Sequence, residues 1–224
     1  MEDFSQVPFD GSEFAENPEP RCPCLLLLDT SASMSGEPIR LLAEGVDAFR
    51  DEMAADDLAS KRAEVAVVTF GPVEVPVDFE TADGFVPPRL NASGQTPMGQ
   101  AIERAVDMVD RRKQSYKEGG VAYYRPWIFM ITDGAPTDDW GRAAALVKEG
   151  EASGAFSFFA VGVQGANMET LSQISVRTPL ALDGLRFRDM FVWLSASMKG
   201  VSHSRPGDEV ALENPTAPSG WATV

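Results

Sequence analysis

Short apolar runs alternate with amphipathic stretches through the middle of the chain. Apolar, β-branched and aromatic residues form runs with the length of buried strands, and between them apolar residues recur every three or four positions, as in helices with one buried face. A short segment containing Pro76 could pair with the second strand, but only as a sheet edge. The expected strands are 24–28, 65–70, 73–77, 127–132, 156–163 and 179–182, and the expected helices are 38–53, 98–109, 143–152, 167–174 and 187–198.

This alternation predicts the fold class. Strands that are apolar throughout, separated by amphipathic helices, are typical of a parallel sheet covered on both faces. We therefore expect a doubly wound α/β fold with a mostly parallel central sheet, helices on both faces and one antiparallel edge strand. In such a sheet the ligand site lies beyond the carboxyl ends of the strands.

The two ends of the chain lack this pattern. Residues 1–20 contain three prolines and six acidic residues without a helical period, which predicts a poorly ordered acidic arm. Residues 201–224 contain three more prolines and no clear pattern, which predicts a C-terminal tail. The folded domain is expected over residues 21–200.

Charge and hydropathy argue against nucleic acid as a partner and against a membrane-spanning or secreted protein. The formal net charge of −15 disfavours nucleic acid, whose binding depends on Lys and Arg. No apolar stretch reaches about 18 residues, so no membrane span is expected. The acidic N-terminus lacks the basic start and apolar run of a secretory signal, and we expect a cytoplasmic protein.

Cysteine and histidine are too scarce for several kinds of site. Cys22 and Cys24, with one residue between them, match neither a redox pair nor a zinc knuckle. The single histidine, His203, lies in the Ser/Pro/Gly-rich C-terminal tail, which argues against a Ser-His-Asp or Cys-His catalyst.

Two expected strands end in an aspartate, Asp29 and Asp133. Because the carboxyl ends of parallel strands meet at one edge of a sheet, both should face the same rim. Asp29 opens an Asp-x-Ser-x-Ser sequence with Ser31 and Ser33, and Thr96 precedes the second helix and could reach the same rim. Carboxylates and hydroxyls are hard oxygen ligands that suit Mg²⁺, Mn²⁺ or Ca²⁺, not zinc.

Each of these residues also has a simpler structural interpretation. Asp29 and its serines could form a helix-capping turn, and Thr96 could cap the helix that follows it. Asp133 could belong to an ordinary Asp-Gly-x-Pro turn.

The enzymatic alternative is a magnesium-dependent phosphohydrolase of the haloacid-dehalogenase type, which also places an aspartate after its first strand. That chemistry needs a second acid two residues later as general acid and base, and this chain has Ser31 there. We therefore expect no enzymatic activity.

Together these motifs resemble the von Willebrand factor type A (VWA) family over about residues 24–198. The resemblance implies a Rossmann-like fold and a metal-ion-dependent adhesion site (MIDAS). It implies that Ser31 and Ser33 bind the ion directly, and that Asp29 and Asp133 act largely through water. Thr96 would bind directly or through water, and a carboxylate from an Asp or Glu of a partner protein would complete the coordination. Mg²⁺ is the expected ion, with Mn²⁺ or Ca²⁺ as alternatives.

Three segments further resemble the bacterial tellurium-resistance TerY type: the Cys-Leu-Leu-Leu-Leu-Asp-Thr-Ser-Ala-Ser-Met run, the Gly-Gln-Thr-Pro-Met loop and the Trp-Ile-Phe-Met-Ile-Thr-Asp-Gly run. This resemblance implies a stress-response adaptor acting beside a protein kinase and a phosphatase. Asp138 and Trp140 are candidate partner contacts at the rim of the site. In the remaining alternative, the same scaffold holds its partner through the terminal arms.

Overall fold

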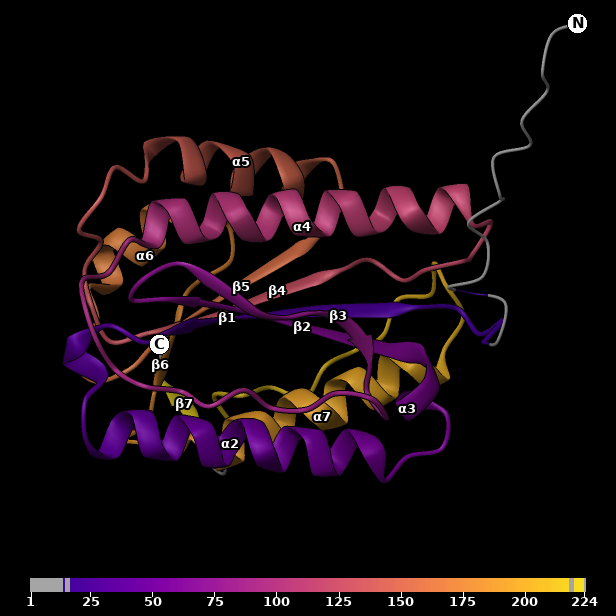
Figure 1. The fold of residues 1–224 in the computed structure, drawn as a ribbon, viewed down its shortest axis with the longest axis horizontal. Coiled ribbons are helices and arrows are strands. Elements are labelled where there is room, and N and C mark those ends of the chain that lie inside the picture. The colour runs from indigo at the N-terminus through magenta and orange to yellow at the C-terminus, as the bar shows by residue number, and fades with distance from the viewer. Residues whose placement is uncertain (1–13, 15–16, 218–219, 224) are drawn as a thin grey trace, which may run out of the picture.

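The computed structural model describes residue 14, residues 17–217 and residues 220–223 (Figure 1). This part of the chain contains one sheet of seven strands in the order β3-β2-β1-β4-β5-β6-β7. β3 runs antiparallel to β2, β7 runs antiparallel to β6, and the five strands between them are parallel. The strands are β1 (Cys22–Asp29), β2 (Ala63–Phe70), β3 (Glu74–Thr81), β4 (Trp127–Thr132), β5 (Ser157–Gly162), β6 (Leu180–Leu182) and β7 (Ala222–Thr223).

Helices cover both faces of the sheet. In Figure 1, α4, α5 and α6 lie above it, and α2, α3 and α7 lie below. The predicted doubly wound α/β fold is therefore confirmed, with β7 as a second antiparallel edge strand that the sequence pattern did not predict. The helices are the 3₁₀ turn η1 (Ala32–Met34), α2 (Glu37–Ala54), α3 (Ala59–Arg62), α4 (Met98–Glu118), α5 (Gly141–Ala152), α6 (Met168–Ile174) and α7 (Phe187–His203).

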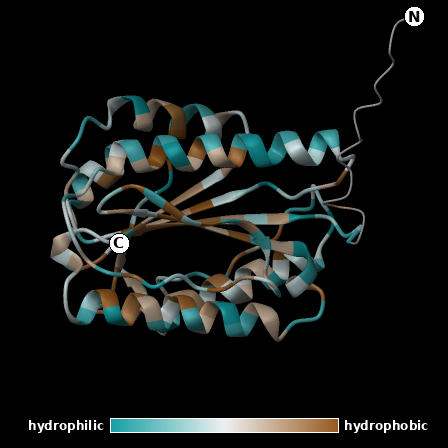
Figure 2. Ribbon diagram, in the orientation of Figure 1, coloured by the Kyte–Doolittle hydropathy of each residue, from teal (hydrophilic) through white to brown (hydrophobic). Residues whose placement is uncertain are grey.

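The central strand explains why the core divides into two layers. Every residue of β1 is buried, and successive side chains point to opposite faces of a strand. Leu26 and Leu28 pack below the sheet with α2 and α7, whereas Leu25 and Leu27 pack above it with α4 and α5. Figure 2 shows the apolar faces of the helices turned toward the sheet.

The C-terminal segment lies along α7 and returns to the sheet. The indole Nε1 of Trp193 donates to the carbonyl of Glu213 at 2.9 Å. The rings of Trp193 and Trp221 meet edge to face, 5.5 Å apart. Ala222 then pairs with Leu182. Residues 201–224, where the sequence pattern predicts no element, thus contain the last turn of α7 and β7, joined to the core by buried tryptophans.

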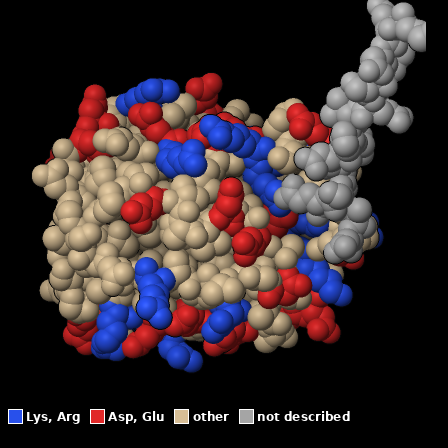
Figure 3. Space-filling view, in the orientation of Figure 1, with Lys and Arg blue, Asp and Glu red and all other residues tan. Residues whose placement is uncertain are grey.

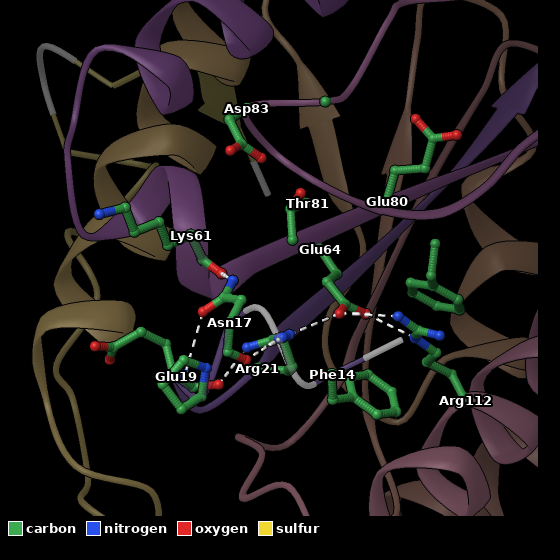
Figure 4. Close-up of a pocket in the computed structure, with 13 residues that line it drawn as sticks. Phe14, Asn17, Glu19, Arg21, Lys61, Glu64, Glu80, Thr81, Asp83 and Arg112 are labelled. Atoms are coloured by element: carbon green, nitrogen blue, oxygen red, sulfur yellow. Dashed lines mark hydrogen bonds and ion pairs between the residues drawn. The ribbon is translucent and has the colours of Figure 1, made fainter. Parts of the chain in front are cut away.

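A buried ionic network closes the amino end of the sheet (Figure 4). The Glu64 carboxylate accepts hydrogen bonds from Arg21 at 2.9 Å, from Arg112 at 2.7 and 2.9 Å and from the Tyr116 hydroxyl. The side chains of Arg21 and Glu64 are 2% and 1% exposed. Because a buried charge is costly unless paired, these partners hold one another in place.

The same end of the domain binds part of the N-terminal segment. Arg21 donates to the carbonyls of Asn17 and Glu19, so residues 17–20 of the predicted acidic arm lie against the domain. Arg62 contacts the Glu19 carboxylate at 2.7 Å and donates to the carbonyl of Ser202, near the end of α7, at 2.7 Å. Residues 1–13 and 15–16 of the predicted arm lie outside the described residues.

None of the described helices combines the length and the apolar character that crossing a membrane requires.

Glu64→Gln tests the ionic network, because the amide keeps the shape and removes the charge that the buried Arg21 and the half-buried Arg112 share. We expect the free energy of unfolding, measured by urea denaturation, to fall by about 3 kcal/mol. Glu44→Gln is the matched control, since Glu44 pairs with Arg40 on the surface with both side chains 56% exposed, and it should cost less than about 0.5 kcal/mol. Equal effects of the two substitutions would contradict this account.

Candidate metal centre

The loops after β1 and β4 and the loop before α4 meet at the carboxyl edge of the sheet. The β1 loop is joined to the loop before α4 by two backbone hydrogen bonds, from Ser93 N to the Thr30 carbonyl (2.8 Å) and from Ala32 N to the Gly94 carbonyl (3.1 Å). Gly94 has a φ of +71°, a backbone conformation that favours glycine. These contacts fix the position of the chain just before Thr96.

Asp29 is the most deeply buried of the predicted site residues, with 0% exposure. Its Oδ1 accepts the backbone N–H of Ser31 at 2.8 Å, and its Oδ2 accepts the hydroxyl of Thr132 at 2.5 Å. Each carboxylate oxygen therefore has its own donor, one from each side of the site.

The Asp-x-Ser-x-Ser sequence after β1 and Asp133 after β4, the two strand-end motifs, are joined by hydrogen bonds. The hydroxyls of Ser31 and Ser33 lie 2.9 Å apart, and Ser33 Oγ donates to Asp133 Oδ1 at 2.7 Å. Ser31 is buried, whereas Ser33 is exposed. The two hydroxyls thus form a line from the interior at Ser31 to the surface at Ser33. There Ser33 meets Asp133, which lies 100 residues later in the sequence.

Thr96 lies on the third side of the site and is 6% exposed. Its backbone N–H donates to Thr137 Oγ1 at 3.1 Å, and its carbonyl accepts the Thr137 N–H at 2.9 Å. A Cβ atom at Gly134 would lie 3.3 Å from Thr96 Oγ1 and 3.8 Å from Asp29 Oδ2, so the Thr96 hydroxyl and the Asp29 carboxylate border the same glycine. The structure therefore brings all five predicted donors to one rim.

The helix-capping interpretation of Thr96 does not match the structure. The N-cap position of α4 is Pro97, without a side-chain cap. Asp138 caps the helix instead, with its two oxygens accepting the N–H groups of Gly99 (3.0 Å) and Gln100 (2.9 Å). A carboxylate at a helix N-terminus is also favoured by the helix dipole.

The two predicted partner contacts both have a structural role. Asp138 is half-buried and holds the loop after β4 against α4. Trp140 is half-buried as well and packs against the upper core layer. Gly99 permits this close packing, because a side chain there would overlap the carbonyl oxygen of Asp139. The contact of Asp138 and Trp140 with a partner stays a prediction.

Burial dominates the electrostatics of the site. It raises the pKa of the Asp29 carboxyl above its usual range, and the nearby Asp133 carboxylate raises that pKa to a smaller extent. Hydrogen bonds from Ser31 and Thr132 act in the opposite direction. A cation at this rim would offset the cost of keeping Asp29 ionised.

The donor set fits a hard cation. It offers two carboxylates and three hydroxyls, which are the ligand types of Mg²⁺, Mn²⁺ and Ca²⁺. Among the described residues no three His, Cys, Asp or Glu side chains gather as a metal cluster, so a metal here would rely on hydroxyls as well as carboxylates.

A cavity of about 660 Å³ lies away from this rim, at the amino end of the sheet (Figure 4). It is bordered by Glu64, by Arg21 and Arg112, which both pair with Glu64, and by Phe14 and Phe79. These groups serve the ionic network and are separate from the candidate metal centre.

Charged residues are unevenly distributed around the candidate centre. Segments 31–36, 93–96 and 133–139 contain no Lys or Arg, and Asp133, Asp138 and Asp139 are their only charged residues. In Figure 3 the end of the molecule over these loops, at the left, is mostly uncharged, whereas basic and acidic side chains mix over the rest of that face.

Comparison with known sequences identifies a family. The von Willebrand factor type A domain matches residues 25–187, which include all five predicted donors. No curated protein sequence matches the chain.

Solved structures support the same fold at low sequence identity. The pilus adhesin SpaC from Lactobacillus rhamnosus GG, in its open conformation, superimposes with a TM-score of 0.63 and 14% identity, over 83% of this chain and 31% of SpaC. The vWF domain of the type V pili tip protein Mfa5 from Porphyromonas gingivalis gives 0.58 and 10%, over 86% of this chain and 99% of that domain. Proximal thread matrix protein 1 from the mussel byssus gives 0.56 and 16%, over 82% and 49%.

The chain therefore spans about a third of the length of SpaC and about half of the length of the mussel protein. At these identities the likeness shows the fold alone.

Asp29→Asn tests the cost of the buried carboxylate. Because the pKa of Asp29 is raised in the folded state, the stability that Asp29 contributes is greatest below about pH 4 and is lost as the pH rises through the folded pKa. In chelator, the unfolding free energy of Asp29→Asn minus that of the unmodified chain should therefore increase between pH 4 and pH 7. Urea denaturation at each pH measures this difference.

The exposed neighbour Asp139 supplies the control for that series. The corresponding difference for Asp139→Asn should change less with pH. A difference for Asp29→Asn that stays flat or decreases with pH would show that burial does not disfavour the Asp29 carboxylate.

Proposed function

The chain belongs to the von Willebrand factor type A family, and from that premise we propose that it is a metal-ion-dependent protein-interaction module. Domains of this family commonly mediate protein interactions, and many bind a divalent metal. The proposed metal ligands are Asp29, Ser31, Ser33, Thr96 and Asp133, and the proposed ion is Mg²⁺, with Mn²⁺ or Ca²⁺ as alternatives.

One observation carries this proposal: the continuous contact from Ser31 through Ser33 to Asp133, at 2.9 and 2.7 Å. It joins the two strand-end motifs and aligns three oxygen-bearing groups along the rim. In the proposed state, the serine hydroxyls bind the ion directly. The buried Asp29 and the half-buried Asp133 orient the hydroxyls and supply negative charge through water.

The proposed partner supplies an Asp or Glu carboxylate. A small hard cation held mainly by neutral hydroxyls retains part of its positive charge and can exchange a water for an anionic oxygen. Because the three loops contain no Lys or Arg, the ion would be the only positive charge among them. Recognition of an acidic partner would then depend on the ion and not on basic side chains of these loops.

We also propose the biological setting by analogy. The three segments that resemble the TerY type support a role as adaptor in a bacterial tellurium-resistance stress system in the cytoplasm, beside a protein kinase and a phosphatase. The analogy rests on those segments, and fold alone does not define a role.

Calorimetric titration tests the metal site. We expect chelator-stripped protein to bind Mg²⁺ or Mn²⁺ at one site, and the double variant Ser31→Ala, Ser33→Ala to bind at least about tenfold more weakly, because both direct ligands are lost. Ser35→Ala is the control, since Ser35 lies in the same loop outside the proposed ligand set. Undiminished affinity in the double variant would refute the assignment.

The partner proposal is tested with paired peptide arrays that carry Asp and Glu at defined positions or Asn and Gln at the same positions. In Mg²⁺, the protein should bind acidic peptides and not their amide counterparts, and EDTA should abolish the signal. Binding that persists in EDTA would instead support recognition by other surfaces, including the terminal arms.

A further inference from the structure

Thr132 is a buried hydroxyl residue at the end of β4, one position before Asp133. Its exposure is 0%, in a strand whose other members are all apolar. Its Oγ1 donates to Asp29 Oδ2 at 2.5 Å and accepts the backbone N–H of Gly134 at 3.2 Å.

These two contacts determine where the hydroxyl proton lies. A threonine hydroxyl has one proton and two acceptor lone pairs, and an ionised carboxylate can only accept. The Gly134 N–H occupies a lone pair, so the single proton is directed to Asp29. The result is an ordered chain of donors from Gly134 through Thr132 to the buried carboxylate.

The contact also completes the environment of Asp29. Ser31 N–H binds Oδ1 at 2.8 Å and Thr132 binds Oδ2, so two donors from opposite sides fix the plane of the carboxylate. Without the hydroxyl, Oδ2 would lose a charge-assisted hydrogen bond in a fully buried position. The carboxylate would then be free to rotate, and its oxygens would no longer be held in place at the rim.

We propose that Thr132 is a positioning residue for the metal ion: it holds the Asp29 carboxylate in its orientation without contacting the ion itself. This inference rests on the proposed function, since it assigns a role at the same site. The last residue of β4 and the residue after it then have separate roles: Thr132 contacts Asp29 in the interior, and Asp133 contacts Ser33 at the rim.

The test compares two pairs of side chains that match in size and differ in the hydroxyl: Thr with Val, and Ser with Ala. Full-length protein carrying Thr132→Val, Thr132→Ser or Thr132→Ala is titrated with Mn²⁺ by calorimetry after chelator treatment. Thermal unfolding in EDTA confirms that each variant is folded. Thr69→Val is the control, because Thr69 is a buried threonine near the same end of β2, on the other side of β1.

We expect affinity to follow the hydroxyl. Thr132→Ser should bind Mn²⁺ within about threefold of the unmodified chain, and both Thr132→Val and Thr132→Ala should bind about tenfold more weakly, since hydrogen bonds to charged groups are among the stronger ones. Thr69→Val should leave the affinity unchanged. If Thr132→Val does not fold, the Ser and Ala variants still carry the comparison.

Two results would overturn the proposal. Unchanged Mn²⁺ affinity in Thr132→Val or Thr132→Ala would show that the hydroxyl does not position Asp29 for the ion. Equal weakening in Thr132→Ser and Thr132→Ala would show that size matters and the hydroxyl does not. Failure of the proposed function looks different, because the unmodified chain would then bind no Mn²⁺ at all.

Discussion

The constraint on which this architecture depends is the burial of one carboxylate at the end of the central strand. A charge removed from water must be compensated by nearby donors, and Asp29 obtains them from two loops that are distant in sequence. The loop after β1 supplies a backbone N–H, and the end of β4 supplies a hydroxyl. Both hydrogen bonds to Asp29 can form only when β1 and β4 lie side by side in the sheet. The polar contacts of the rim therefore depend on the strand order.

Other hydrogen bonds at the rim also hold a third segment, the loop before α4, in place. Thr96 and Thr137 exchange hydrogen bonds through their backbones and one hydroxyl, and Asp138 fixes the start of α4 beside them. The three loops are thus bound to one another before any ion is considered. Because these contacts form without a ligand, less ordering of the loops has to be driven by binding.

Strands β1 to β6, the large helices and the meeting of five oxygen-bearing side chains at one edge could be predicted from the sequence, because each leaves a local signal. The apolar run 24–28 leads directly into the Asp-x-Ser-x-Ser of residues 29–33, and parallel topology places Asp133 at the same edge. The roles of Thr132 and Asp138 could not be predicted, since a hydroxyl or a carboxylate near a strand end does not reveal which distant group it binds. The network of Glu64 with Arg21 and Arg112 was missed for the same reason, and β7 is too short to produce a period.

The contacts of Arg62 affect how the domain opens. This side chain binds Glu19 near the start of the chain and the carbonyl of Ser202 near the end of α7, so it joins segments that lie more than 180 residues apart. Terminal segments usually fray independently, at little cost in free energy. Here, detachment of the segment at Glu19 or of the end of α7 would leave the half-buried Arg62 guanidinium without one of its acceptors. We therefore expect the segment at Glu19 and the last turn of α7 to open together rather than separately.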